Sequence, residues 1–162
     1  MATYAKDVIR DLIDGKLPWQ TTKPIMSDFK DEERFETYLE ILQERVPWKE
    51  RILLPVGEHL YIVQKGNERI VKCDCGHEFG SHEENWKLEA LISVRDSEDA
   101  LREIYPEKLH GDPSWNHLRE YYCPGCRTQL EVEAVPHGYP VIHDFVPDLE
   151  AFYEGWLGRP LP

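Results

Sequence analysis

The chain has 162 residues, the length of one ordinary domain, and 41% of them are apolar, which excludes a disordered or low-complexity chain. Its formal net charge is −12, and an acidic surface repels phosphate groups, so we expect no nucleic acid and no membrane surface as a partner. No apolar run approaches the roughly 18 residues of a membrane-spanning helix, and the first residues lack the pattern of an export signal, so we expect a soluble, cytoplasmic protein.

Helical periodicity marks two segments of the N-terminal third. Residues 4–15 carry apolar side chains on one stripe and end at a glycine, which predicts a short amphipathic helix. Residues 16–30 contain two prolines and no sustained period, so we expect an irregular connection there. The helical period returns over residues 31–46, with acidic residues in the first turn and Pro47 as the stop.

Strand patterns follow in the middle of the chain. Three short strands are predicted at residues 52–54, 60–64 and 69–72. The turn residues Gly66 and Asn67 separate the last two and are typical of a hairpin. A longer alternation of apolar and polar residues over 86–95 predicts a half-buried strand.

Cap and turn signals divide the last third. Asp96 is expected to cap a short helix that runs to residue 105, and Asp112, followed by a proline, is a second predicted helix start. Strands are predicted at 119–122 and 128–134, and a last helix at 148–157. Together these elements predict an α+β fold with helices at both ends and an antiparallel sheet in the middle.

The four cysteines form two close pairs, and each pair follows a predicted strand and contains or adjoins a glycine. Without an export signal, this spacing favours metal ligation over a disulfide framework. Two thiolates on one turn can point at the same ion, and a strand followed by such a knuckle is typical of a zinc ribbon. We therefore predict an antiparallel zinc-ribbon-like β core with flanking N- and C-terminal helices, and a Zn²⁺ site formed by Cys73, Cys75, Cys123 and Cys126.

Other metal and redox interpretations of the cysteines stay open. Rubredoxin-type iron uses the same four thiolates, and a thioredoxin-like pair is disfavoured because Cys123 follows a strand instead of opening a helix. His77 is the one candidate substitute ligand, because it follows Cys75 by two residues. If all four thiolates bind, no coordination position remains for water, and the zinc is structural.

Catalytic interpretations are weaker. His82 and Glu84, followed later by the second cysteine pair, imitate the pattern of zinc deaminases, but that pattern leaves the first pair idle and requires a proline where Tyr122 stands. His143 and Asp144 suggest a dyad, yet no nucleophile motif accompanies them, which favours a structural hydrogen bond. No phosphate-binding loop or nucleophile elbow is present. We predict no catalytic and no cofactor-binding residue in this chain.

Several segments together resemble the gamma, or small, subunit of acetone carboxylases. These segments are residues 33–48 (ERFETYLEILQERVPW), 52–64 (ILLPVGEHLYIVQ), 73–77 (CDCGH), 85–88 (NWKL), 114–126 (SWNHLREYYCPGC), 139–145 (YPVIHDF) and 152–160 (FYEGWLGRP). The resemblance implies a zinc-carrying, non-catalytic subunit of a cytoplasmic complex that carboxylates acetone with bicarbonate and ATP to give acetoacetate. The four cysteines match the zinc position of the family.

The resemblance also implies partners and cofactors. The family's partners are two larger subunits, alpha and beta, in a hetero-oligomer expected to be a dimer of heterotrimers. ATP with Mg²⁺ and manganese are expected on those larger subunits. Acetophenone carboxylase has a similar small zinc subunit, so the ketone stays open. A free-standing zinc-ribbon adaptor is the alternative function.

We expect the chain to form a single compact unit with three parts. Residues 1–50 are predicted to be a helical arm that packs on the core or on partner subunits, 51–135 the zinc-binding antiparallel β domain, and 136–162 a C-terminal loop and helix. Five tryptophans and eight tyrosines exceed what a small core easily encloses, and this aromatic excess favours an obligate interface with partner subunits.

Overall fold

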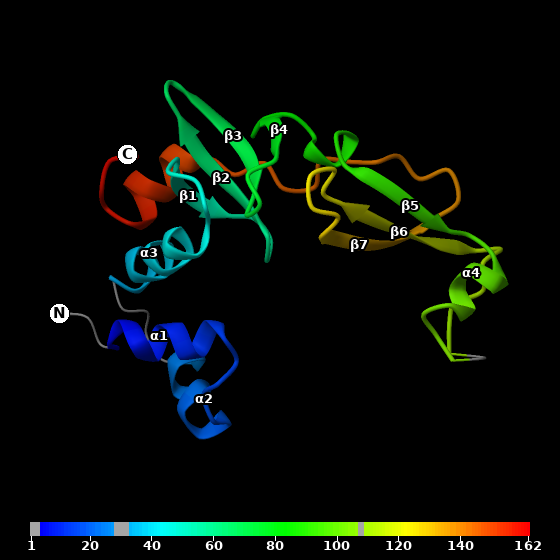
Figure 1. Cartoon of the computed structure of the whole chain (residues 1–162), viewed down its shortest axis with the longest axis horizontal. Coiled ribbons are helices and arrows are strands. Elements are labelled where there is room, and N and C mark those ends of the chain that lie inside the picture. Colours follow the sequence, from blue (N-terminus) through cyan, green and yellow to red (C-terminus); the bar gives the residue numbers. More distant parts are fainter. Residues whose placement is uncertain (1–3, 28–32, 107–108) are drawn as a thin grey trace. The chain divides into compact units, whose positions relative to one another are not determined.

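The computed structural model describes residues 4–27, 33–106 and 109–162 (Figure 1). The chain divides into two compact units, Met1–Leu53 with Pro147–Pro162, and Leu54–Val146. Within the described residues, no helix is both long and apolar enough to cross a membrane. The elements confirm an α+β chain with antiparallel sheets and helices towards both ends.

The first unit contains the helices α1 (Lys6–Ile13), α2 (Trp19–Ser27) and α3 (Arg34–Arg45) and the π-helix η2 (Ala151–Trp156). The buried side chains of this unit include Ile9 of α1 and Leu39, Ile41 and Leu42 of α3. Lys6 forms exposed ion pairs with acidic side chains of α3, which contribute little to stability. The helices predicted over 4–15 and 31–46 are confirmed by α1 and α3, although residues 31 and 32 lie outside the described part of the chain.

The C-terminal segment completes the core of this first unit. Tyr153 is fully buried, and its hydroxyl donates to the carbonyl oxygen of Leu53 at 2.8 Å. The rings of Phe35 and Phe152 meet edge to face with centroids 5.2 Å apart. The predicted last helix is therefore present, and its contacts with α3 explain why residues distant in sequence share one core.

The prediction of an irregular segment over 16–30 is wrong for its described part, because helix α2 lies there. Pro18 precedes the helix, where a missing N–H is harmless, and its carbonyl accepts hydrogen bonds from the backbone of Thr21 and Thr22. Pro24 inside the helix removes one backbone hydrogen bond. Ile25 is 1% exposed, and its burial helps to offset that loss. Residues 28–30 lie outside the described part of the chain.

The first sheet has the strand order β1-β2-β3-β4. Its strands are β1 (Arg51–Pro55), at which the chain passes from the first unit into the second, β2 (Leu60–Lys65), β3 (Glu68–Cys73) and β4 (Glu78–Ser81). The predicted hairpin is confirmed, with Leu60 opposite Cys73 and Lys65 opposite Glu68. Gly66 has φ +60°, a conformation that suits glycine in this turn. Strand β4 was not predicted, because it has only four residues, and one of them is a glycine.

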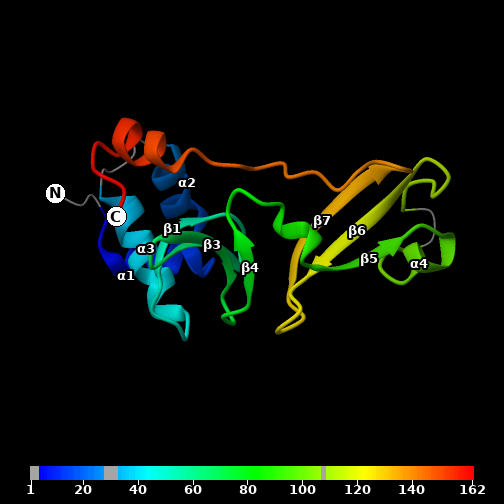
Figure 2. The same cartoon turned by 90° about the horizontal axis from the view of Figure 1, so that it is seen from above.

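The second sheet has the order β5-β6-β7 and is antiparallel throughout (Figure 2). Its strands are β5 (Leu91–Arg95), β6 (Asn116–Tyr122) and β7 (Gln129–Pro136). The strand predicted over 86–95 is only half correct, because Trp86–Leu88 form the 3-10 helix η1. The Asn85 side chain accepts from the backbone N–H of Lys87, and Trp86 and Lys87 are both buried, whereas neighbours in a half-buried strand point to opposite faces.

Two predicted helix starts also differ from the structure. Ser97, not Asp96, caps helix α4 (Glu98–Arg102), and its hydroxyl accepts from the backbone N–H of Ala100. The Asp112 carboxylate accepts from the backbone N–H of Ser114 at 2.8 Å and forms a turn that leads into β6 instead of a helix. Aspartate favours both kinds of structure, so the local sequence did not distinguish them.

Candidate metal centre

The two cysteine pairs converge in the second unit. The sulfur atoms of Cys73 and Cys126 lie 3.8 Å apart, those of Cys75 and Cys123 lie 3.7 Å apart, and all four lie within 4.8 Å of one another. A tetrahedron with zinc–sulfur distances of about 2.3 Å has edges of about 3.8 Å, whereas a disulfide requires about 2.05 Å. The four cysteines form no disulfide and have the spacing of a metal site.

The first knuckle begins where β3 ends. The backbone N–H of Cys73 donates to the carbonyl of His77 at 2.9 Å, and that of Gly76 donates to the carbonyl of Cys73 at 2.9 Å. Gly76 has φ +99°, which a residue with a side chain rarely adopts. These bonds close a tight turn that directs the thiols of Cys73 and Cys75 to the same side.

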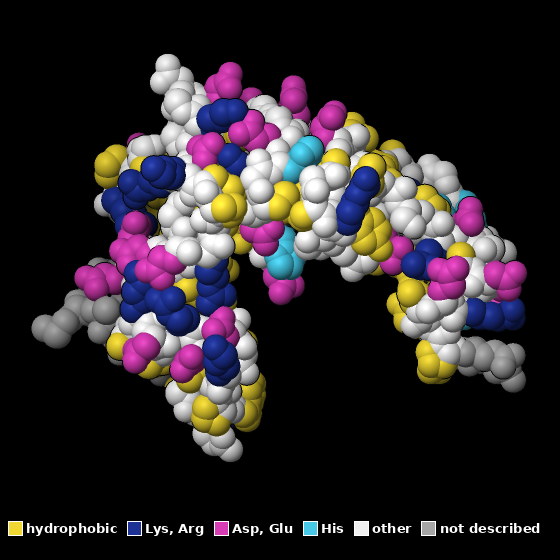
Figure 3. Space-filling model, viewed as in Figure 1, with side chains coloured by type: hydrophobic (Ala, Val, Ile, Leu, Met, Phe, Trp, Pro, Cys, Tyr) yellow, Lys and Arg dark blue, Asp and Glu magenta, His cyan; other side chains and the backbone are white. Residues whose placement is uncertain are grey.

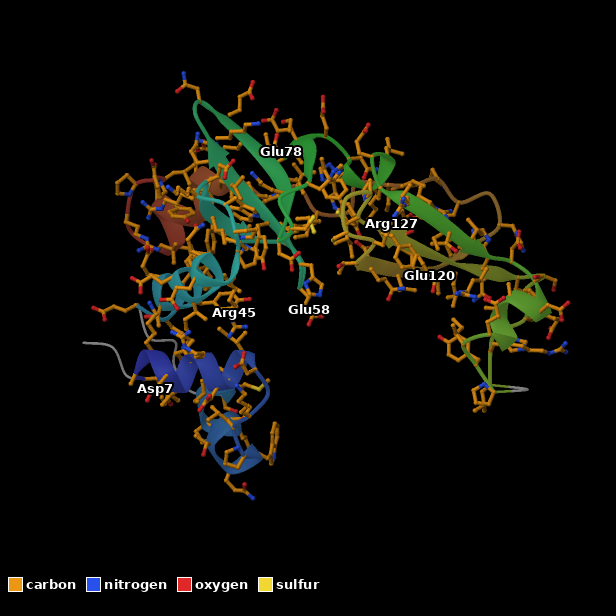
Figure 4. The ribbon with its side chains drawn as sticks, in the orientation of Figure 1. Asp7, Arg45, Glu58, Glu78, Glu120 and Arg127 are labelled. Carbon is orange, nitrogen blue, oxygen red and sulfur yellow. The ribbon has the colours of Figure 1, made fainter. Side chains whose placement is uncertain are left out.

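The second knuckle repeats this arrangement after β6. The backbone N–H of Cys123 donates to the carbonyl of Thr128, and that of Arg127 donates to the carbonyl of Cys123, both at 2.9 Å. Arg127, labelled in Figure 4, has φ +66°, the one positive φ recorded for a residue other than glycine in the described chain. The turn therefore holds a strained residue directly after Cys126.

Gly125 lies where the two knuckles approach each other. A Cβ atom at this position would lie 3.1 Å from the Cβ of His77 and 3.3 Å from the sulfur of Cys75. Both distances are shorter than ordinary packing contacts, so a side chain here would push the knuckles apart. Glycine is required by this close approach.

The four thiols differ in exposure and in acidity. Cys73 and Cys123 are fully buried, whereas Cys75 and Cys126 reach the surface. Burial raises the pKa of Cys73 and of Cys75 in the metal-free chain. Burial also acts to raise the pKa of Cys126, but hydrogen bonds with the Thr128 hydroxyl and backbone N–H, and with neighbouring thiols, outweigh it and hold that pKa at about 7. A bound cation would favour the thiolate form of all four.

Residues around the cluster that the sequence did not single out support its shape. The Nδ1 atom of His59 lies 2.7 Å from a carboxylate oxygen of Asp74, whose backbone N–H donates to the carbonyl of His59. These contacts anchor the first knuckle to the start of β2. Neither residue carries a spacing pattern, so only the fold identifies them.

A second polar cluster lies in the same unit, around Lys87. This side chain is completely buried, and its Nζ atom lies 2.7 Å from Glu131, 2.5 Å from Glu133 and 3.1 Å from Asp144. The ring of Tyr121 lies 5.3 Å from the ammonium, and its hydroxyl donates to Glu133 at 2.9 Å. Burial acts to lower the pKa of Lys87, but the three carboxylates outweigh it and raise that pKa.

The Lys87 cluster also brings three carboxylates to the spacing of a metal site, but the ammonium lies among them and supplies the positive charge. Asp144 is paired with Lys87 in this cluster, and the interpretation that His143 and Asp144 form no catalytic dyad stays a prediction. A cavity of about 180 Å³ lies beside the cluster. Its walls include His143 and Asp144 but no serine, cysteine, threonine or lysine. The polar residues of its walls are His82, Glu131, His143 and Asp144.

The comparison with known protein families decides the identity of the chain. The family model described as acetone carboxylase gamma subunit matches residues 46–157, which contain all four cysteines and Lys87. The chain belongs to the acetone carboxylase gamma subunit family. The predicted resemblance is confirmed.

Two curated relatives of this gamma subunit family agree. The chain is 50% identical over 161 residues to the acetone carboxylase gamma subunit of Xanthobacter autotrophicus (strain ATCC BAA-1158 / Py2), which covers 98% of this chain and 96% of that protein. It is 32% identical over 84 residues to the acetophenone carboxylase beta subunit of Aromatoleum aromaticum (strain DSM 19018 / LMG 30748 / EbN1), covering 48% of this chain and 62% of that protein. Membership supports a role as a subunit of a multi-subunit carboxylase.

Within this gamma-family chain, the ring nitrogens of the alternative metal ligands are not part of the thiol cluster. Among the described residues, the cluster that holds Cys73 contains cysteines only. The ring of His77 packs edge to face against Phe79, with centroids 4.9 Å apart. The Nδ1 atom of His82 lies 3.3 Å from the carbonyl oxygen of Arg69. The arrangement of zinc deaminases is therefore not formed, because the first cysteine pair is part of the cluster.

Proposed function

We propose that this chain is the zinc-binding gamma subunit of an ATP-dependent ketone carboxylase. The complex would convert acetone, bicarbonate and ATP to acetoacetate, with the chemistry on its larger subunits. The observation that carries this proposal is the 50% identity, over 98% of the chain, to a protein named as an acetone carboxylase gamma subunit. The likeness to an acetophenone carboxylase subunit leaves a longer or aromatic ketone as an alternative substrate.

The role proposed for the metal is structural. Zinc would be held by Cys73, Cys75, Cys123 and Cys126, and four thiolates complete a tetrahedron without a position for water. The bound ion would supply the positive charge that stabilises the buried thiolates. Because Cys73 ends β3 of the first sheet and Cys123 follows β6 of the second, the site would join the two sheets.

The proposed partners are a larger alpha and a larger beta subunit, in a cytoplasmic dimer of heterotrimers. ATP, Mg²⁺ and manganese would bind to those subunits. The absence of a phosphate-binding loop from this sequence supports this division of labour.

The test is native mass spectrometry of the protein purified from its own cells, with co-purifying chains and metals identified. We expect two larger subunits, one zinc per copy of this chain, and ATP hydrolysis that depends on a ketone. Arrival as a single chain with one zinc would replace the carboxylase role with that of a free-standing zinc-ribbon adaptor. Arrival without zinc would refute the metal assignment and leave the subunit role standing.

A further inference from the structure

Strand β5 forms an open edge of the second sheet. The strand order β5-β6-β7 leaves one side of β5 without a hydrogen-bonding neighbour in the described chain. Four of its five residues, Leu91 to Val94, are exposed, and three of these are aliphatic, with exposed fractions of 39% for Leu91, 41% for Ile92 and 47% for Val94. An apolar edge of this kind is a template for pairing with another strand.

The opposite edge of the same sheet is protected. Strand β7 carries the acidic residues Glu131 and Glu133 within its length and ends at Pro136, which has no N–H to donate. Its pairing with β6 is also irregular between Tyr121 and Tyr122. Charges, a proline and an irregularity of this kind are the devices by which proteins prevent edge pairing. The exposed stretch Leu91 to Val94 of β5 has none of them, and the one charged residue of the strand, Arg95, is paired with Glu103 and Glu120.

The side chains of β5 present apolar surface on both faces of the sheet. Ile92 pairs with Tyr121 and Val94 pairs with Arg119, so these two side chains share one face, and Leu91 lies on the other. A strand added at this edge would meet aliphatic neighbours on each face, in addition to the backbone groups. The hydrophobic side chains that reach the surface between charged ones are visible on the face shown in Figure 3.

Charge at the ends of β5 defines the chemistry of the partner. The exposed Glu89 precedes the strand and the exposed Asp96 follows it, whereas Arg95 at the end of the strand is already paired with Glu103 and Glu120. We propose that β5 binds an extended segment of one of the larger carboxylase subunits, aliphatic or β-branched at its centre and carrying lysine or arginine at both ends. This proposal rests on the proposed function and adds the surface and the mode of docking, in which the segment becomes a fourth strand.

The first test compares two valines of the same sheet in the co-expressed complex. Val94 of β5 and Val132 of β7 have nearly equal exposed fractions, 47% and 48%. We expect Val94→Lys to reduce the amount of this chain that co-purifies with the larger subunits at least tenfold, because a lysine interrupts the apolar edge. Val132→Lys is the matched control and should leave co-purification within about twofold of wild type.

The second test needs no variant. Hydrogen–deuterium exchange of peptides that cover residues 89–96 should slow at least tenfold when the larger subunits bind, because the outward amides of β5 become hydrogen-bonded. A charge-reversal variant complements this measurement, and Glu89→Lys should weaken assembly with the larger subunits at low salt. Glu58→Lys, at an exposed position labelled in Figure 4, is the control and should not weaken it. Unchanged exchange over 89–96 in an intact complex would overturn the docking site even if Val94→Lys failed to fold.

The outcomes separate this docking site from the proposed function. If wild-type chain never co-purifies with larger subunits, the proposed function fails. If it does, and Val94→Lys assembles normally, only the β5 site is refuted. If Val94→Lys instead abolishes a dimer of the isolated chain, and exchange is slow without larger subunits, the occupant is a second copy and the proposal is wrong.

Discussion

The two polar clusters of the second unit both bring several ionisable side chains close together, but they differ in where the compensating positive charge comes from. The cysteine cluster brings four thiols, two of them buried, to the spacing of a metal site, whereas the Lys87 cluster carries its own cation among three carboxylates. The ligands of the first are concentrated on two short turns, and those of the second are scattered over η1, β7 and the segment before Asp148. Spacing along the chain revealed the first cluster, and nothing in the spacing revealed the second.

The largest expected effect is that of Cys73→Ser. The fully buried thiol would be lost, so we expect metal binding to be abolished and several kcal/mol of folding free energy to be lost with it. Metal analysis and thermal unfolding measure the two quantities. Val71→Ala, a change of a buried side chain in the same strand, is the control and should cost about 1–3 kcal/mol while metal stays bound. Retained zinc in Cys73→Ser would refute the four-thiolate site.

The next largest effect is expected from a change in the Lys87 cluster, which should lower stability without affecting the metal site. Lys87→Met removes the buried ammonium and leaves three carboxylates close together, which should cost about 3–5 kcal/mol in urea unfolding. Zinc content should not change. Lys16→Met, which breaks an exposed ion pair with Asp14, is the control and should have no measurable effect. A stable Lys87→Met protein would show that the cluster contributes only specificity.

Acidification should narrow the difference in the free energy of unfolding between Lys87→Met and wild type. Burial already raises the pKa of Glu131, and loss of the ammonium should raise it further. A group whose pKa is raised by folding gains stability as the pH falls through that pKa, so protonation relieves the repulsion that the variant creates. Urea unfolding of both proteins at pH 7 and pH 5 measures this difference. A larger stability difference at pH 5 than at pH 7 would contradict the interpretation that repulsion among the carboxylates destabilises Lys87→Met.

A smaller effect is expected from Gly125→Ala. The added methyl group would lie against the Cβ of His77 and the sulfur of Cys75, so we expect a loss of about 1–3 kcal/mol and weaker zinc retention against a chelator. Gly155→Ala is the control, because nothing lies within 4 Å of the corresponding Cβ position. Equal behaviour of the two variants would argue against the close approach of the knuckles.

The smallest effect has the opposite sign. Arg127→Gly relieves the positive φ after Cys126, so thermal unfolding should show a gain of about 0.5–1 kcal/mol, with zinc content unchanged. A loss of stability would mean that the arginine side chain contributes more than its backbone strain removes.

Sequence patterns predicted the elements whose signals are local. Helices α1 and α3 and the hairpin of β2 and β3 were predicted from periodicity, caps and the turn at Gly66. Helix α2 was missed because Pro18 before it and Pro24 inside it outweighed a short pattern that only the burial of Ile25 supports. The division of the chain at residues 50 and 135 stays a prediction.

The amino-acid sequence by itself determined the candidate metal ligands, the α+β class and the family, because two cysteine knuckles and matched segments are properties of adjacent residues. Only the tertiary structure decided that the knuckles meet with sulfur atoms 3.7 and 3.8 Å apart, that Lys87 is buried among carboxylates, and that β5 is an open edge. The physical reason is that strand pairing and burial depend on contacts between residues far apart in the chain, which periodicity does not record.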